Sequence, residues 1–148
     1  MTWTSRGCPN RCPFCLVPRI EGDLVELDEW PLSAVVMDNN FLACSEAHQE
    51  RVIRRLAGAG LREIDFNQGL DARRYAPAFR QMLDRHDVRL RVWRFAYDRP
   101  GDWPAVEAAV RDLHKAGVRW QDIQIYLLYN HRETPEEAVE RARQVVGD

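Results

Sequence analysis

The sequence of 148 residues contains no apolar run that approaches the roughly 20 residues needed for a membrane-spanning helix. Cysteines are few, four in total, and three of them fall in one motif, so the disulfide framework of a secreted protein is not expected. Met1 and Thr2 lead straight towards that motif, and we expect no signal peptide. A net charge of −2 gives no bulk attraction to nucleic acid or anionic membranes. These absences predict a cytoplasmic protein that does not bind membranes, and nucleic-acid binding is not indicated.

The three clustered cysteines lie in the run Gly7-Cys8-Pro9-Asn10-Arg11-Cys12-Pro13-Phe14-Cys15. Their C-x3-C-x2-C spacing indicates a small inorganic centre or a strained disulfide, because thiolates bind both zinc and iron–sulfur clusters. Clusters held by cysteine ordinarily use four thiolates, so three predict a [4Fe–4S] cube with one iron open to substrate or cofactor. The alternative is a structural zinc site whose fourth ligand is a histidine or Cys44. A lone cysteine usually behaves as a small buried hydrophobic residue, so we assign Cys44 no ligand role.

The rest of the chain predicts a single α/β domain over residues 1–148. Short apolar runs that are typical of buried parallel strands cover residues 34–37, 61–66, 88–97 and 123–129. Amphipathic stretches with helix-start signals cover residues 45–58, 77–85, 102–117 and 134–146. With a first strand at residues 2–5 this makes five β elements, and repeated βα units form a parallel sheet with right-handed crossovers. Between residues 16 and 33 we expect little regular structure, beyond a short strand or turn at 24–27.

The cysteine spacing, Phe14 just before the third cysteine, and the preceding Thr4-Ser5-Arg6-Gly7 together resemble the radical S-adenosylmethionine (radical SAM) superfamily. The resemblance implies a partial (βα) barrel, with the cluster loop after the first strand and function at the C-terminal ends of the strands. About five βα units are expected here, and the sixth strand of the family is missing. The run that starts at Cys12 is also similar to methylthiotransferase-like and cobalamin-associated subgroups, whose further domains are not encoded in these residues.

The resemblance further implies that Cys8, Cys12 and Cys15 each bind one iron, and that the fourth iron binds the amino and carboxylate groups of S-adenosylmethionine. One electron from the reduced cluster then cleaves the sulfonium C–S bond. The resulting 5′-deoxyadenosyl radical abstracts hydrogen from a substrate that the sequence does not identify. An electron donor such as flavodoxin or ferredoxin is implied as a partner, and no residue is assigned a catalytic role.

Polar residues near the ends of the predicted strands are candidates for binding S-adenosylmethionine. Asp38 and Asn39 stand where the family usually has a Gly-Gly-Glu stretch, and Phe14 resembles the aromatic residue near the adenine. The full candidate set is Phe14, Asp38, Asn39, Asn67, Gln68, Arg73, Arg94, Asp98 and Asn130. Each has a structural alternative: core packing for Phe14, a turn or solvated loop for most others, and an ion pair for Arg94.

Five strands would leave one side of a partial barrel open, with unpaired backbone and apolar surface. A radical intermediate also needs a site with little water. We therefore expect self-association, a partner protein or a longer natural chain to cover this edge. The alternative is that the final helix, or the arginines of residues 88–97, protect a short edge strand well enough.

Overall fold

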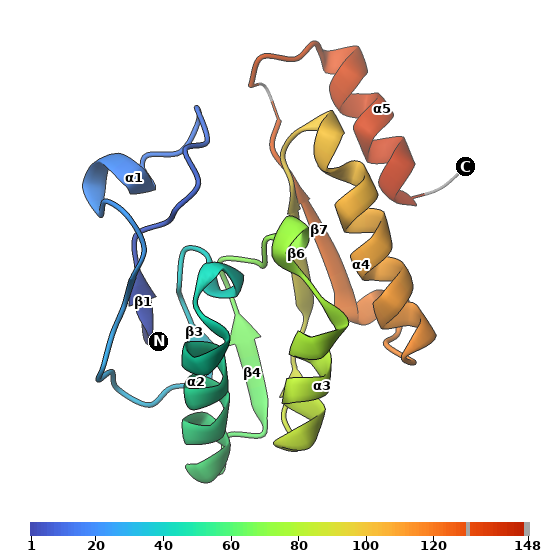
Figure 1. Cartoon of the computed structure of the whole chain (residues 1–148). Helices are drawn as coiled ribbons and strands as arrows, with labels where there is room; N and C mark the ends of the chain where they lie inside the picture. The colour runs from blue at the N-terminus through green and yellow to red at the C-terminus, as the bar shows by residue number, and fades with distance from the viewer. Residues whose placement is uncertain (130, 147–148) are drawn as a thin grey trace.

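Parallel strands follow one another in space in their chain order in the computed structural model, which describes residues 1–129 and 131–146 (Figure 1). β3 pairs with β4, β4 with β5, and β6 with β7, all in parallel. β1 and β2 form a separate antiparallel pair. The strands are β1 (Ser5–Arg6), β2 (Val25–Glu26), β3 (Val35–Val36), β4 (Glu63–Phe66), β5 (Arg89–Leu90), β6 (Trp93–Tyr97) and β7 (Ile123–Leu127). The fold is α/β with parallel sheets, and the described strands do not close into a barrel.

The run at residues 88–97, which the sequence predicts as one strand, forms two, so that prediction is wrong. The cause lies in the neighbouring β4, after which the chain turns away and returns to the sheet at Leu70. Arg91 donates its amide hydrogen to the Ile64 carbonyl of β4 (2.8 Å), whereas the Leu70 amide donates to the Arg94 carbonyl of β6 (2.7 Å). The break between β5 and β6 thus falls where the run changes its pairing partner.

The first predicted strand, residues 2–5, is also divided between two partners. The Thr2 amide donates to the Val35 carbonyl (2.9 Å), and Thr2 forms a parallel bridge with Val36. Three residues later the chain pairs with β2 instead, in the antiparallel sense. The N-terminal segment therefore begins beside β3 and then leaves the parallel sheet to enter the cysteine loop.

The helices agree closely with the sequence prediction, because their start signals are local. Ser45 accepts a hydrogen bond from the His48 amide at the start of α2 (3.2 Å), and Thr134 and Glu137 exchange hydrogen bonds as a capping box at α5. A short helix after the cysteines, α1, was not predicted. The helices are α1 (Val17–Ile20), α2 (Glu46–Gly58), α3 (Pro77–Arg85), α4 (Trp103–Lys115) and α5 (Pro135–Val146). None of those described is long and apolar enough to span a membrane.

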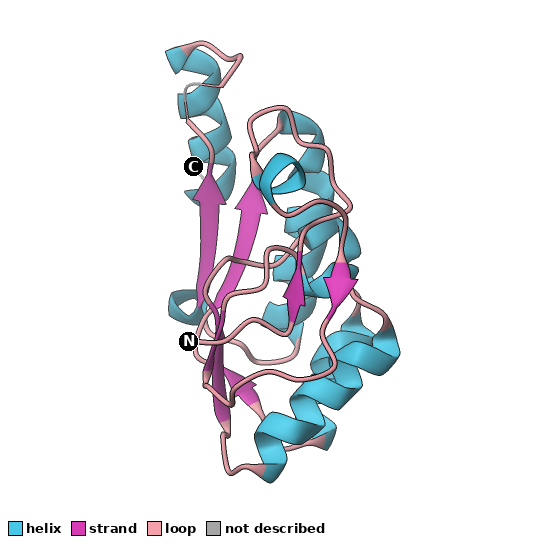
Figure 2. Cartoon of the chain, turned by 90° about the vertical axis from the view of Figure 1, so that its left-hand side faces the viewer, coloured by secondary structure: helices cyan, strands magenta, loops and turns pink. Residues whose placement is uncertain are grey.

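The core lies between the strands and the helices α2, α3 and α4, which run alongside them (Figures 1 and 2). Aromatic rings fill its centre: Phe41 lies 4.5 Å from Phe66 between ring centroids, and Phe79 packs against both. Burying each large apolar side chain stabilises the fold by roughly 1.5–3 kcal/mol. This core holds the C-terminal ends of β3, β4 and β6 in place, and the polar segments that follow these ends form the site described next.

Candidate metal and cofactor site

All three cysteines of the motif line one cavity of about 170 Å³. Cys8 is buried, with 8% of its surface exposed, whereas Cys12 and Cys15 are half-buried. Segments that follow β3, β4 and β6 complete the lining, so the cavity lies at the C-terminal ends of parallel strands, as the resemblance implies. Five of the predicted cofactor-binding residues share this lining with the thiols: Phe14, Asn39, Gln68, Arg73 and Asp98.

Backbone geometry at Gly7 brings the chain into the cysteine loop. Gly7 has a φ of +72°, and a Cβ there would lie 2.1 Å from the carbonyl oxygen of Asp23, so only glycine fits. The next residue, Cys8, donates its amide hydrogen to the Gly22 carbonyl (3.3 Å). The two ends of the loop are thereby held together at Gly7 and Gly22.

The carboxylate of Glu21 is a second anchor of the loop. It accepts hydrogen bonds from the Gly7 amide (2.9 Å), from the Arg6 guanidinium (2.8 Å) and from the Asn39 side-chain amide (2.8 Å). Asn39 follows β3, so Glu21 joins the cysteine loop to the sheet. The sequence gives no signal for this role, because the partners of Glu21 lie 14 to 18 positions away.

Asp71 connects three segments at the wall of the cavity. Asn10 of the cysteine loop and Asn40 after β3 both donate to its Oδ2 atom, at 2.8 and 3.2 Å, and Arg73 pairs with both carboxylate oxygens at 2.8 Å. Burial alone would raise the pKa of Asp71, but the hydrogen bonds from Arg73, Asn10 and Asn40 outweigh burial and bring the pKa to about 2. Asp71 is therefore ionised, and it fixes the loop against the strand ends.

Burial raises the pKa of two acidic groups in the cavity lining, Cys12 and Asp98. Burial raises the pKa of the Cys12 thiol, although the guanidinium groups of Arg73 and Arg99 oppose the shift. Burial also raises the pKa of Asp98, with a further contribution from the nearby carboxylate of Asp102. The carboxyl group of Asp98 therefore lies in the cavity lining and is available to polar groups of a ligand.

Phe14 faces two cavities. Besides the cavity of the thiols, it lines a second one of about 280 Å³, and Asp98 lines both. The ring of Phe14 packs edge-on against His131 of the loop between β7 and α5, with 5.2 Å between ring centroids. Phe14 therefore both packs against a neighbour and presents an aromatic surface to the site.

Three predicted cofactor-binding residues lie outside the lining of the cavity. Asp38 is buried and accepts hydrogen bonds from Thr4 and Ser5. Arg94 pairs with Asp65. Asn67 has its side-chain amide 3.6 Å from the sulfur of Met37. Asn130, the remaining candidate, lies outside the described residues.

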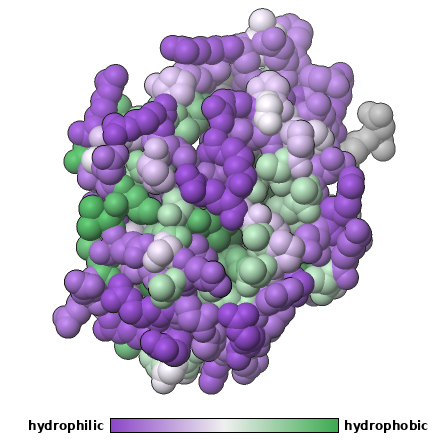
Figure 3. Space-filling view, in the orientation of Figure 1, coloured by the Kyte–Doolittle hydropathy of each residue, from purple (hydrophilic) through white to green (hydrophobic). Residues whose placement is uncertain are grey.

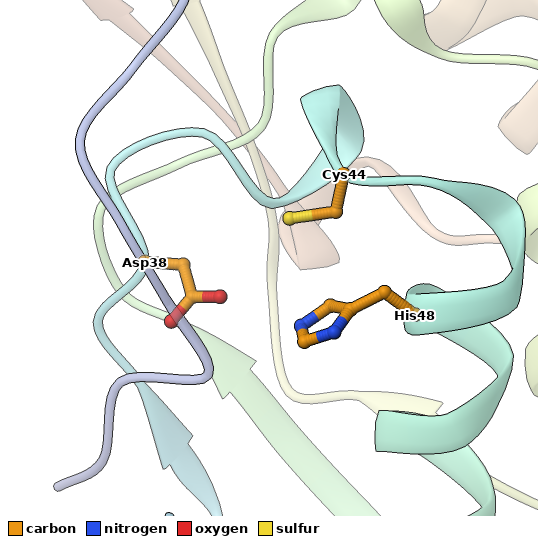
Figure 4. Close-up of side chains that lie close together, drawn as sticks. All are labelled: Asp38, Cys44 and His48. Carbon is orange, nitrogen blue, oxygen red and sulfur yellow. The ribbon is translucent and has the colours of Figure 1, made fainter. Parts of the chain in front are cut away.

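Asp38 belongs to a second group of potential ligands, with Cys44 and His48, and the three side chains point towards one another (Figure 4). Their ligand atoms lie within 4.8 Å of one another, and in the described part of the chain no other three such residues do so. Each ring nitrogen of His48 already has a partner, Thr4 at 3.2 Å and Arg51 at 2.9 Å. Burial raises the pKa of Cys44 to about 11, so its thiol stays protonated. We therefore assign these residues to a structural hydrogen-bond network.

The spacing of the thiols in the motif bears on the choice between zinc and a cluster. Tetrahedral zinc, with Zn–S bonds of about 2.3 Å, places its ligand atoms about 3.8 Å apart. Among the described residues Cys8, Cys12 and Cys15 do not form a group within 4.8 Å, so at least two of their sulfur atoms lie farther apart than in a tetrahedral zinc site.

The chain is similar over part of its length to a curated protein, the ribosomal protein uS12 methylthiotransferase RimO of Bradyrhizobium diazoefficiens. The two are 37% identical over 60 residues, which make up 40% of this chain and 10% of that protein. The chain thus matches about a tenth of the length of this relative. No protein-family model and no solved structure matches the chain.

Proposed function

We propose that the chain is a radical SAM enzyme, or the core domain of one, with a [4Fe–4S] cluster on Cys8, Cys12 and Cys15. The observation that carries the proposal is the cavity in which these three thiols meet five predicted cofactor-binding residues at the ends of parallel strands. The partial match to a methylthiotransferase supports the same superfamily, since the motif is also similar to its methylthiotransferase-like subgroup. We further propose that the α/β fold is a partial barrel of the radical SAM type.

When bound, the cluster and S-adenosylmethionine would supply an electron and a 5′-deoxyadenosyl group for radical abstraction of hydrogen from a substrate. The residues of this chain bind and orient these groups. Cys8 is buried and Cys12 and Cys15 are half-buried, so the three thiols lie largely out of contact with water, as a radical intermediate requires. Asp71, held by Arg73, keeps the loop fixed, so that the three thiols hold their positions through turnover.

The remaining cavity residues suit the groups of S-adenosylmethionine. Phe14 offers an aromatic surface for the adenine, and Asp98 offers a carboxyl group for hydroxyl or amino groups. Asn39 and Gln68 add amide groups to the lining. An external electron donor of the flavodoxin or ferredoxin type completes the proposed system.

The proposal is tested by incubating anaerobically reconstituted protein with a reductant and S-adenosylmethionine. We expect a change in the EPR signal of the reduced cluster and release of 5′-deoxyadenosine. Replacing Cys8, Cys12 or Cys15 with Ala should abolish both signals, because each thiol holds one iron. Cys44→Ala is the matched control and should retain both. Loss of the cluster in the Cys44→Ala protein, or its retention in a Cys12→Ala protein, would contradict the assignment.

A further inference from the structure

Asn40 lies between a thiol of the motif and the carboxylate of Asp71. It follows β3 and is buried, with 3% of its surface exposed. Its side-chain nitrogen Nδ2 is 3.8 Å from the sulfur of Cys8 and 3.2 Å from Oδ2 of Asp71. Among the residues that the structure describes, no other side-chain amide is within hydrogen-bond distance of a cysteine in the motif.

Asp71 determines which end of the Asn40 amide faces the thiol. Arg73 pairs with both oxygens of Asp71, which is therefore a carboxylate and can only accept hydrogen bonds. Asn40 must then turn its NH₂ group, and not its carbonyl oxygen, towards Asp71. One of the two hydrogens on Nδ2 reaches Asp71, and the other is available to the sulfur of Cys8.

The other end of the same amide makes no hydrogen bond within the described part of the chain, so the contact with Asp71 decides the orientation. The carbonyl oxygen of Asn40 is buried and has no hydrogen-bond partner among the described residues. An amide turned the other way would place this oxygen against the negative charge of Asp71 and the NH₂ group away from it. Because Asn10 also donates to Asp71, the carboxylate is held in place from the side of the cysteine loop as well.

We propose that Asn40 is a positioning residue that donates a hydrogen bond to the sulfur of Cys8 and thereby raises the reduction potential of the cluster. This inference rests on the proposed function. Reduction adds negative charge to the cluster and its sulfur ligands, and a donor next to a ligand sulfur stabilises that charge. Asp71, Asn10 and Arg73 act through Asn40, since they fix its orientation.

The test is the midpoint potential of the reconstituted full chain, measured by EPR-monitored redox titration. Asn40→Leu removes the donor at similar volume and should lower the equilibrium constant for reduction about tenfold, which is about 59 mV for a one-electron couple. Asn67→Leu is the matched control, because it removes a similar amide–sulfur contact, to Met37, outside the cavity. Its potential should equal that of the unmodified protein.

Equal potentials for the Asn40→Leu and unmodified proteins would overturn the inference and leave the proposed function intact. An unmodified protein that assembles no cluster would instead refute the proposed function itself. If the Asn40→Leu protein fails to assemble a cluster while the unmodified protein succeeds, the hydrogen bond is tested in the unmodified protein, labelled with ¹⁵N at the asparagine side chains. A ¹⁵N coupling to the reduced cluster in pulsed EPR is then expected, and its absence would overturn the inference.

Discussion

At the scale of single residues, the site depends on one carboxylate whose partners are distant in the sequence. Asp71 meets Asn40 from 31 positions away and Asn10 from 61 positions away. Within its own turn Asp71 also accepts a hydrogen bond from the Arg73 amide (3.2 Å), and this is a local contact. The long-range contacts depend on how the sheet brings its strand ends together, which no local pattern contains.

Gly7 gives a direct test of the loop geometry. Gly7→Ala should lower the free energy of unfolding by about 2–5 kcal/mol, the sum of a left-handed alanine and an overpacked contact with Asp23. Gly22→Ala is the matched control, because Gly22 has a similar φ of +78° but open space around it. It should cost only about 1–2 kcal/mol in urea unfolding. Equal losses for the two variants would contradict the close contact at Gly7.

The cysteine motif was the most specific pattern in the sequence, because three thiols within eight positions predict one shared inorganic centre. The polar residues that are candidates for binding S-adenosylmethionine were harder to predict. Asp98 directly follows β6 and lines the cavity, whereas Arg94 is the second residue of β6 and pairs with Asp65. The sequence predicts one strand over residues 88–97, so it does not show that β6 begins only at Trp93 and that Arg94 lies near its start.

At the scale of elements, helix starts were predictable and strand pairing was not. Pro77 and the capping box at Thr134 act within one turn of helix, so the sequence alone locates α3 and α5. The division between β5 and β6 depends on where the neighbouring strand leaves the sheet. This division depends on two segments of the chain, whereas hydrophobic periodicity is read from one segment alone and cannot predict it.

Helix α2 is joined to the segment before the cysteine loop through His48, and this contact predicts a pH dependence. Burial lowers the pKa of His48 below 6.5, although Glu26 acts in the opposite direction. The unfolded chain therefore binds this proton more readily, so the stability is fully present above about pH 6.5 and declines below it, by at most about 1.4 kcal/mol per pH unit.

Urea unfolding on both sides of pH 6.5 measures this decline. His48→Gln removes the titrating group and keeps a hydrogen-bonding side chain near Thr4, so the variant should lose part of the slope below pH 6.5. The comparison uses the difference in slope, which cancels the contribution of other acids and bases. An identical slope in the two proteins would show that the His48 imidazole does not titrate differently on folding.

At the scale of the whole molecule, exposed apolar side chains lie at several places on the described surface, and two of these places bear on association. One is on the side where α1 and β1 lie, where hydrophobic residues gather at the left of the space-filling view (Figure 3); Leu16, Ile20 and Val25 are exposed in this region. The other is at β7, which pairs with β6 on one side and with no other described strand on its outer side. Tyr126 of β7 is 43% exposed.

The open edge of β7 is the structural basis for the expected self-association, partner protein or longer chain. We expect light scattering of the isolated chain to show species larger than a monomer. Tyr126→Lys should reduce their amount, because a charged side chain on an edge strand opposes pairing with another strand. A stable monomer that consumes S-adenosylmethionine with its substrate, without any addition, would refute the dependence on a partner.

The central claim, a [4Fe–4S] cluster on three thiols, is tested most directly by the metal and sulfide content of the anaerobically reconstituted protein. The account predicts a brown protein with about four irons and four sulfides per chain. The Cys8→Ala protein, measured in parallel, should lose most of both. A colourless protein that holds one zinc ion and no sulfide would contradict the claim and support a metal-stabilised binding module instead.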